Sequence, residues 1–267
     1  MIKVFETANS CITYCNENTL IAEKELKGKK VIALLSGGID SQAVSMYLQQ
    51  LNISHINYFF DYGFNKYDKI YADMFEHETL KLDLNKLYFE QKIHLQYYEK
   101  CQCTSPQLAV HLYGLDQLKE KYKDYVFLMP GMPFFFNKND DGTIGNSLPD
   151  YTQLSYYRYM CIEHINLYPY FWIQFSALNQ MSKDTIQSNF NISDYQKKIT
   201  LYNNLGLNVI PQQHKKTGFE EYKDFLKYEK NVDYNKEFRK PISYIKPSIG
   251  VISRSLLNND LEKIIGK

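Results

Sequence analysis

The stretch "VIALLSGGIDSQAV", residues 31–44, decides the fold. Its apolar run, residues 31–35, stops abruptly at a Ser-Gly-Gly turn, which is typical of a buried strand in a parallel sheet. Apolar side chains then recur with helical spacing over residues 40–51. A second apolar run at 55–60 completes a strand–helix–strand unit. The turn therefore joins the end of a strand to the start of a helix.

The rest of the chain continues this alternation of apolar runs and amphipathic stretches. We predict strands at 31–35, 55–60, 92–98, 125–129 and 170–175, and helices at 40–51, 66–80, 106–122, 151–167, 183–190, 194–205 and 218–230. Such a pattern predicts an α/β fold with a doubly wound, parallel, five-stranded, Rossmann-like sheet. We divide the chain into an N-terminal extension (1–28), the α/β domain (29–190) and a mostly helical C-terminal extension (191–267).

Composition narrows the class of protein. The chain has 267 residues, is 44% hydrophobic and carries a net charge of +1, so it is no general polyanion binder. No apolar run approaches the roughly 20 residues of a membrane span, and the first residues lack the pattern of a signal peptide. Five cysteines, an odd number, argue against a disulfide framework. We expect a cytoplasmic protein with no membrane partner.

The turn has the features of an anion site. Gly37 and Gly38 let the backbone approach a ligand closely, and the following helix directs free N–H groups at the same place. Ser36 and Ser41 can donate hydrogen bonds to phosphate oxygens. The carboxylate of Asp40 would repel a phosphate unless a cation lay between them, and Mg²⁺ is the usual cation. We therefore expect a phosphate site with Mg²⁺ bound at Asp40.

The motif "SGGIDS", residues 36–41, resembles the PP-loop of the N-type ATP pyrophosphatases. That resemblance implies a fold of the HUP, or adenine nucleotide alpha hydrolase, type. It implies ATP and Mg²⁺ as cofactors and cleavage of ATP between its α- and β-phosphates. The residues that would bind ATP on this basis are Ser36, Gly37, Gly38, Asp40 and Ser41, with Asp40 also catalytic and the Mg²⁺ ligand.

Other stretches extend the resemblance along residues 30–190. The segment "SALNQMSKDTI" (176–186) is similar to a second family motif and implies a catalytic role for Lys183, although Thr185 stands where the family usually has Glu. The end of the second strand, Phe60 and Asp61, would lie near adenine. The segment "PGMPFFF" would place Gly131 at the nucleotide, and "LPDYTQL" resembles a substrate loop that includes Pro149 and Asp150.

Residues 197–246 hold eleven Lys and Arg against six Asp and Glu. This basic stretch is either a solvated helical face or a lid over an anion. Lys215 within it is a candidate for binding departing pyrophosphate.

The nearest families by motif are the synthases of the cyano-deazaguanine queuosine precursor and the asparagine synthetases. They imply a ligase that adenylates a carboxylate or carbonyl oxygen and then amidates it with ammonia, with a modified-nucleobase precursor or similar small molecule as substrate. The chain departs from both families. Its last cysteine is Cys161, so we expect no C-terminal four-cysteine zinc site. About thirty residues precede the first strand, so we expect no glutaminase domain there.

Three alternatives stay open. A tRNA- or small-molecule-thiolating enzyme would use a sulfur donor and require Cys101 or Cys103, and an enzyme like PAPS reductase would need a reducing thiol. A non-catalytic nucleotide sensor would bind ATP without turnover. Zinc on these two cysteines with Cys11 and Cys15 is disfavoured by their spacing. A tRNA partner is not favoured, and the sequence does not decide whether the protein is a homo-oligomer.

Overall fold

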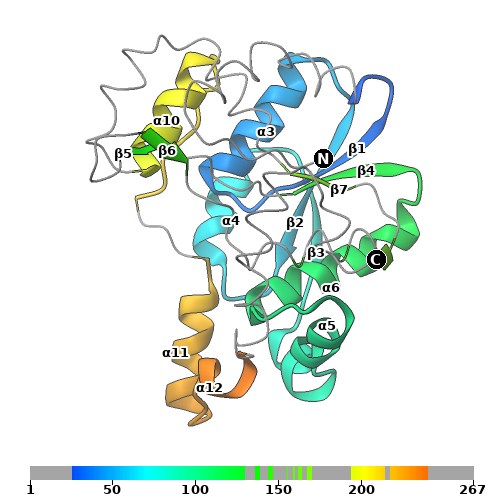
Figure 1. Ribbon diagram of the computed structural model, residues 1–267, viewed down its shortest axis with the longest axis vertical. Coiled ribbons are helices and arrows are strands. Elements are labelled where there is room, and N and C mark those ends of the chain that lie inside the picture. The colour runs from blue at the N-terminus through cyan, green and yellow to red at the C-terminus, as the bar shows by residue number, and fades with distance from the viewer. Residues whose placement is uncertain are drawn as a thin grey trace.

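The computed structural model describes residues 26–129, 136–138, 144–146, 155, 159, 162–163, 167–169, 194–213 and 217–239. Its main sheet contains the strands β1 (Lys30–Leu34), β2 (His55–Asp61), β3 (Glu78–Lys81), β4 (Tyr125–Met129) and β7 (Leu167–Pro169) (Figure 1). The strand order is β3-β2-β1-β4-β7, and all neighbouring pairs are parallel. The order changes direction between β1 and β4, as in a Rossmann-like sheet. The predicted parallel α/β fold is confirmed at this level.

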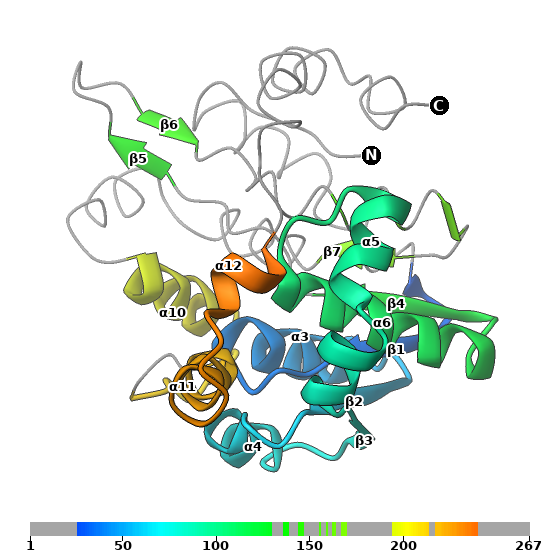
Figure 2. The same cartoon turned by 90° about the horizontal axis from the view of Figure 1, so that it is seen from below.

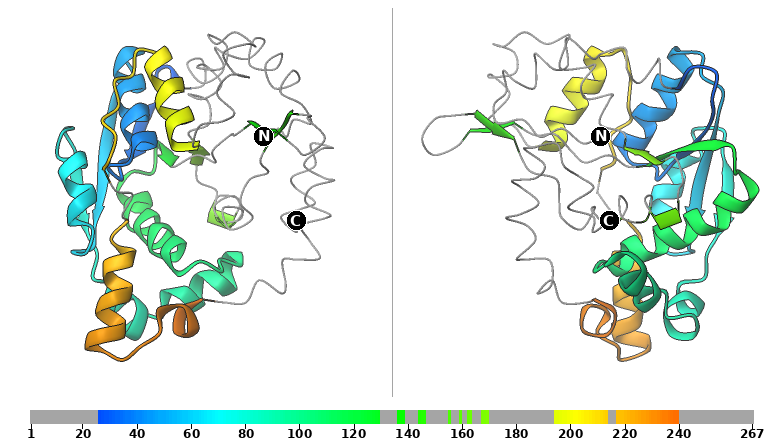
Figure 3. Two further views of the ribbon diagram at one scale, coloured as in Figure 1. Left: turned by 90° about the vertical axis from the view of Figure 1, so that its left-hand side faces the viewer. Right: turned by 45° about the vertical axis from the view of Figure 1, so that its right-hand side comes forward.

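Helices cover both faces of the sheet. Val31 and Ala33 of β1 pack with α3 (Ile39–Gln50) and α10 (Asp194–Asn204), and α4 (Lys66–Ala72) lies on the same face through Phe59. Figure 3 shows α10 alongside α3. Ile32 and Leu34 point to the other face, which is covered by α5 (Ile93–Cys101), α6 (Pro106–Lys121), α11 (Phe219–Glu229) and α12 (Tyr234–Phe238). This alternation explains why β1 is apolar throughout.

Helices α11 and α12 lie next to each other (Figure 2). Aromatic side chains fix both to the second face of the sheet. Tyr88 lies on the short π-helix η1 (Lys86–Glu90) and stacks on Tyr222 of α11, with ring centroids 5.7 Å apart, and on Phe238 of α12 at 4.7 Å. Its hydroxyl lies 3.1 Å from that of Tyr234. Residues predicted to form a C-terminal extension therefore contribute to the central core on both faces of the sheet.

One predicted element is wrong and a second one is too long. Residues 92–98, predicted as a strand, belong to helix α5, because Ile93, Tyr97 and Cys101 are buried with helical spacing. The helix predicted at 66–80 ends at Ala72 in α4, and residues 78–81 form the edge strand β3 instead. β3 has four residues, none of them fully buried, so it lacks the apolar run that identifies the central strands.

The other predicted elements divide into two groups. The first group is confirmed to within one or two residues at each end. It contains the elements predicted at 31–35, 40–51, 55–60, 106–122, 125–129, 194–205 and 218–230. The elements predicted at 170–175 and 183–190, and most of the helix predicted at 151–167, lie outside the described residues. A small antiparallel pair, β5 (Phe136–Lys138) and β6 (Ile144–Asn146), forms a separate sheet. Within the described part of the chain, no helix has both the length and the apolar character needed to cross a bilayer.

The docking of α11 gives a test of the aromatic core. Tyr222 is fully buried, whereas Tyr228 on the same helix is 72% exposed. We expect Tyr222→Ala to lower the free energy of unfolding by about 3–5 kcal/mol, because a large ring leaves a cavity, and Tyr228→Ala to change it by less than about 0.5 kcal/mol. Urea unfolding of both variants measures the difference. Equal effects would mean that α11 does not pack as described.

Candidate functional site

The Ser36–Ser41 turn lies at the carboxyl end of β1, which is hydrogen-bonded to β2 on one side and β4 on the other. The strand order reverses between β1 and β4, and ligands of open α/β sheets bind outside the carboxyl ends at such a point. The turn leads directly into α3, whose N-cap is Gly38. The first N–H groups of α3 have no carbonyl partner within the helix and face this place. Topology thus puts the motif where an anionic ligand is expected.

The two serines of the motif are joined by hydrogen bonds. The Ser36 backbone N–H donates to Ser41 Oγ at 3.1 Å, and Ser41 Oγ donates to the Gly38 carbonyl at 2.9 Å. The two hydroxyl oxygens lie 3.2 Å apart. Ser41 is buried and Ser36 is exposed. Ser41 therefore holds the turn together, while Ser36 is exposed to solvent.

Gly37 is required by both conformation and space. Its φ is +80°, in the region that favours glycine, and an added Cβ would lie 2.2 Å from the carbonyl oxygen of Asp68. The turn is thus pressed against the backbone of α4. At Gly38, by contrast, a Cβ would meet only Ser36 Oγ at 3.5 Å. Gly38 leaves the space above the Ser36 hydroxyl open, as a phosphate-binding turn needs.

The buried side chain of Gln42 ties this turn to a distant segment. Its Nε2 donates to the Gly37 carbonyl at 2.7 Å and to the Ile210 carbonyl at 3.1 Å. Its Oε1 accepts from the Ile210 N–H at 2.8 Å. The segment that follows α10 is therefore fixed beside the turn, and α10 itself lies along α3.

Helix α10 places two side chains on Asp40. Lys198 Nζ lies 2.5 Å from Asp40 Oδ2, and the Tyr202 hydroxyl donates to Asp40 Oδ1. The Lys198 side chain is only 12% exposed, against 33% for Asp40. Both carboxylate oxygens of Asp40 are thus engaged by α10.

This arrangement does not fit Mg²⁺ at Asp40. A magnesium ion needs a carboxylate oxygen at about 2 Å, and here an ammonium group and a hydroxyl hold both oxygens. Among the described residues, no group of three or more histidine, cysteine, aspartate and glutamate side chains is arranged to hold a metal ion. The turn itself does fit a phosphate group, through Ser36, Gly38 and the N–H groups of α3.

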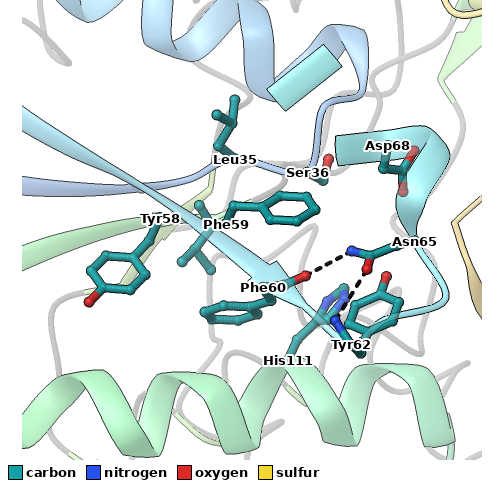
Figure 4. A pocket seen from close by; sticks show the side chains of 10 residues that line it. Leu35, Ser36, Tyr58, Phe59, Phe60, Tyr62, Asn65, Asp68 and His111 are labelled. Atoms are coloured by element: carbon teal, nitrogen blue, oxygen red, sulfur yellow. Dashed lines mark hydrogen bonds between the residues drawn. The ribbon is translucent and has the colours of Figure 1, made fainter. Parts of the chain in front are cut away.

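A cavity of about 40 Å³ lies next to the turn (Figure 4). It is lined by Leu34, Leu35, Ser36, Tyr58, Phe59, Phe60, Tyr62, Asn65, Asp68 and His111. Asn65 shapes one side, because its amide donates to the Phe60 carbonyl at 2.8 Å and its oxygen accepts from the Tyr62 N–H at 3.2 Å. The cavity has room for a few water molecules rather than a nucleoside.

Among the described residues that line this cavity, Asp68 is the acidic one. It is 7% exposed and accepts a hydrogen bond from Gln212 Nε2 at 3.0 Å. Burial raises the pKa of the Asp68 carboxyl to about 7, opposed by the Gln212 hydrogen bond and assisted by the charges of Glu220 and Glu221. Asp68 therefore titrates near neutral pH in a cavity that Ser36 also lines. No motif in the sequence points to this residue.

Of the two residues predicted near adenine, Phe60 lines the cavity and Asp61 does not appear among its described lining residues. Phe60 lines the cavity and packs tightly against Gly114 of α6, where an added Cβ would lie 2.5 Å from its ring. The carboxylate of Asp61 accepts from the Gly63 N–H at 2.9 Å and so caps the turn after β2. Phe60 is close to the Ser36 turn, whereas Asp61 has a structural role in this conformation.

The cysteines considered for sulfur chemistry are buried. Cys101 and Cys103 are each 2% exposed, and their thiols donate to the carbonyls of Tyr97 and Ser105. Burial raises the pKa of the Cys103 thiol, which disfavours the reactive thiolate. Neither residue has the accessible, activated character of a sulfur carrier.

The structure thus brings together Ser36, Gly37, Gly38, Asp40 and Ser41, with Phe60 nearby. The predicted residues Gly131, Pro149, Asp150, Lys183 and Lys215 lie outside the described residues.

Sequence reasoning missed the α10 residues. Lys198 lies on the face of the helix that also carries the intermediate or buried side chains of Tyr195, Ile199 and Tyr202. A lysine among aromatic and apolar positions requires an acidic partner, which is the signal that would have identified it.

Comparison with known proteins gives little further information. No family model matches the chain, and no curated protein matches it. A crystal structure of a predicted subunit of tRNA methyltransferase from Methanocaldococcus jannaschii is similar, with 18% identity, a TM-score of 0.30, and coverage of 70% of this chain and 100% of that chain. A likeness at this TM-score carries no argument about function.

Gly37→Ala tests the close contact between the turn and α4. Gly28 provides a matched control, since its φ is +77° but nothing lies within 4 Å of an added Cβ. We expect Gly28→Ala to lower the free energy of unfolding by about 1–2 kcal/mol from backbone strain alone. Gly37→Ala should cost about 2–5 kcal/mol, because the clash adds to that strain. Denaturant unfolding of the two variants compares the costs, and similar values would contradict the contact.

Asp68→Asn tests the buried carboxyl. The folded-state pKa, about 7, lies above the ordinary value of 3.8, so between these values only the folded state keeps the proton. The free energy of unfolding of the wild type therefore falls as pH rises through this window. Asparagine keeps the acceptor for Gln212 and cannot ionise. We therefore expect the free energy of unfolding of Asp68→Asn, relative to that of the wild type, to be higher at pH 8 than at pH 5. The increase should be at most about 2–4 kcal/mol, because one pKa unit corresponds to about 1.4 kcal/mol.

The measurement is thermal or urea unfolding at several pH values. Asp124→Asn is the control, because Asp124 is exposed and its charge stays in water. A stability difference for Asp68→Asn that does not change with pH would show that Asp68 ionises as it does in the unfolded chain.

Proposed function

We propose that this protein is an AMP-forming, ATP-cleaving enzyme of the PP-loop type. The observation that carries the proposal is the position of the Ser36–Ser41 turn, at the carboxyl end of β1 where the parallel sheet reverses its strand order. A phosphate chain in this place would meet the N–H groups of α3, the Ser36 hydroxyl and the open space above Gly38. The resemblance of "SGGIDS" to the PP-loop supplies the reaction class.

The proposed reaction is a displacement at the α-phosphate. An acceptor oxygen, from a carboxylate or carbonyl group, attacks the α-phosphorus. The bond from this phosphorus to the oxygen bridging the α- and β-phosphates breaks, and pyrophosphate leaves. Ammonia then displaces AMP from the adenylated acceptor. Positioning and charge stabilisation make the main contribution in such steps, and here the rigid turn fixed by Ser41 and Gln42 supports the positioning.

Magnesium would accompany ATP through its phosphate oxygens, and we assign it no protein ligand. Lys183 remains the proposed lysine for pyrophosphate. The nucleoside needs more room than the cavity beside Phe60 provides, so we expect the side chains there to rearrange on binding. This expectation agrees with Phe60 as a neighbour of adenine.

We propose nitrogen rather than sulfur as the second substrate, with a modified-nucleobase precursor or a similar small molecule as the acceptor. The burial of Cys101 and Cys103 supports this choice, because a sulfur carrier needs an accessible thiolate.

Phosphorus NMR of the purified protein with ATP, Mg²⁺ and a small-molecule cell extract tests the proposal. We expect AMP and pyrophosphate to increase together. Ser36→Ala should slow this reaction by about tenfold to a hundredfold, because one hydrogen bond to a charged phosphate is lost. Ser54→Ala is the matched control, since Ser54 is exposed and precedes β2 at the opposite edge of the sheet.

Formation of ADP and phosphate would contradict the proposed reaction. Binding of ATP without any cleavage, in the extract and again after addition of tRNA, would favour a nucleotide sensor over an enzyme.

A further inference from the structure

Asp40 creates an electrostatic problem at the turn. It lies in the first turn of α3, beside the N–H groups proposed to bind a phosphate chain. A carboxylate there repels an anion unless a cation neutralises it. The sequence suggests Mg²⁺ as that cation, but the structure already provides one, the ammonium group of Lys198, at 2.5 Å from Asp40 Oδ2.

We propose that Lys198 is the cation of this turn: its ammonium group binds the phosphate chain, and Asp40 positions that group instead of binding Mg²⁺. The inference rests on the proposed function, because it concerns the same phosphate site. Lys198 becomes a phosphate-binding residue, and Asp40 and Tyr202 become positioning residues.

The location of Lys198 supports this role. A cation is disfavoured at a helix N-terminus by the helix dipole, so its presence at the start of α3 needs a specific reason. The Asp40 carboxylate provides that reason. The resulting pair is formally neutral, which leaves the N–H groups of α3 available to an anion.

The environment of Lys198 is preorganised. Its side chain is only 12% exposed, and in such a place an interaction with a phosphate is stronger than in water. Helix α10 is held along the face that carries Lys198: Ile199 and Tyr202 are buried in the core, and the Tyr195 hydroxyl accepts from the Gln212 N–H at 2.8 Å. The ammonium group is therefore held at the turn before a ligand arrives, which lowers the entropic cost of binding.

Calorimetric titration with inorganic pyrophosphate tests the proposal, at constant ionic strength, once with EDTA and once with excess Mg²⁺. We compare the wild type with Lys198→Met, Lys198→Arg and Asp40→Asn. Lys123→Met is the control for loss of one positive charge, because Lys123 is 71% exposed and precedes β4 at the amino edge of the sheet. Thermal unfolding of each variant reports its folding.

We expect the wild type to bind pyrophosphate in EDTA. Lys198→Met should weaken this binding by about tenfold to a hundredfold, the range for one charge-assisted hydrogen bond. Lys198→Arg should restore most of the affinity, and Lys123→Met should leave it unchanged. Asp40→Asn should bind pyrophosphate in EDTA at least as tightly as the wild type, because it removes a negative charge and keeps an acceptor for Lys198.

Other results would overturn the proposal. If Asp40 is a magnesium ligand, Asp40→Asn loses the binding that depends on Mg²⁺, whereas Lys198→Met strengthens it by removing a competitor. If the pair only joins α10 to α3, Lys198→Met unfolds at a lower temperature but binds pyrophosphate like the wild type. Either result leaves the proposed function intact, whereas a wild type that binds neither pyrophosphate nor ATP, with or without Mg²⁺, overturns both.

Discussion

The structure around the turn depends on one buried amide, that of Gln42. It lies inside the protein, where its polar atoms must find hydrogen-bond partners, and it finds them on Gly37 and on Ile210, 168 residues further along the chain. Satisfying this amide brings the segment after α10 to the turn. The same segment carries Gln212, which reaches the buried carboxyl of Asp68. A local motif and a distant helix are thus joined by the requirement that a buried polar group be paired.

The sequence predicts β1, α3, β2, α6 and β4 because each has a strong local pattern. An apolar run bounded by turn residues identifies a buried strand, and apolar spacing of three and four residues identifies a helix. The failures occurred where that pattern is weak. "KIHLQYY" contains both periods within seven residues, and its helix starts after Lys92, which adopts a left-handed conformation that no propensity indicates. β3 is a short edge strand whose side chains are mostly exposed. Its strand conformation therefore depends on pairing with β2 and not on a local apolar pattern.

The site was predictable to a similar extent. Ser36, Gly37, Gly38 and Ser41 are adjacent in sequence, and their spacing alone indicates an anion-binding turn. The groups that modify this turn are far away in sequence: Asp68 on α4, Gln212 after α10, and Lys198 and Tyr202 on α10. Their positions follow from how α4 and α10 pack on the same face of the sheet. A single sequence indicates that Lys198 needs an acidic partner, but not which of the acidic residues provides it.

These contacts change how Asp40 is understood. The motif alone contains one charged residue, Asp40, and no cation. From the motif alone, a carboxylate next to phosphates therefore requires a metal ion. The packing of α10 on α3 adds Lys198, which the motif does not contain. The charge of Asp40 is then neutralised by a residue of the protein itself. The cost of holding Lys198 at 12% exposure is offset only if its charge is paired, and Asp40, which also accepts from the Tyr202 hydroxyl, provides that pairing. A phosphate chain would add an anionic partner to the same ammonium group. The ion pair thus keeps a buried cation stable and places it where a phosphate is expected.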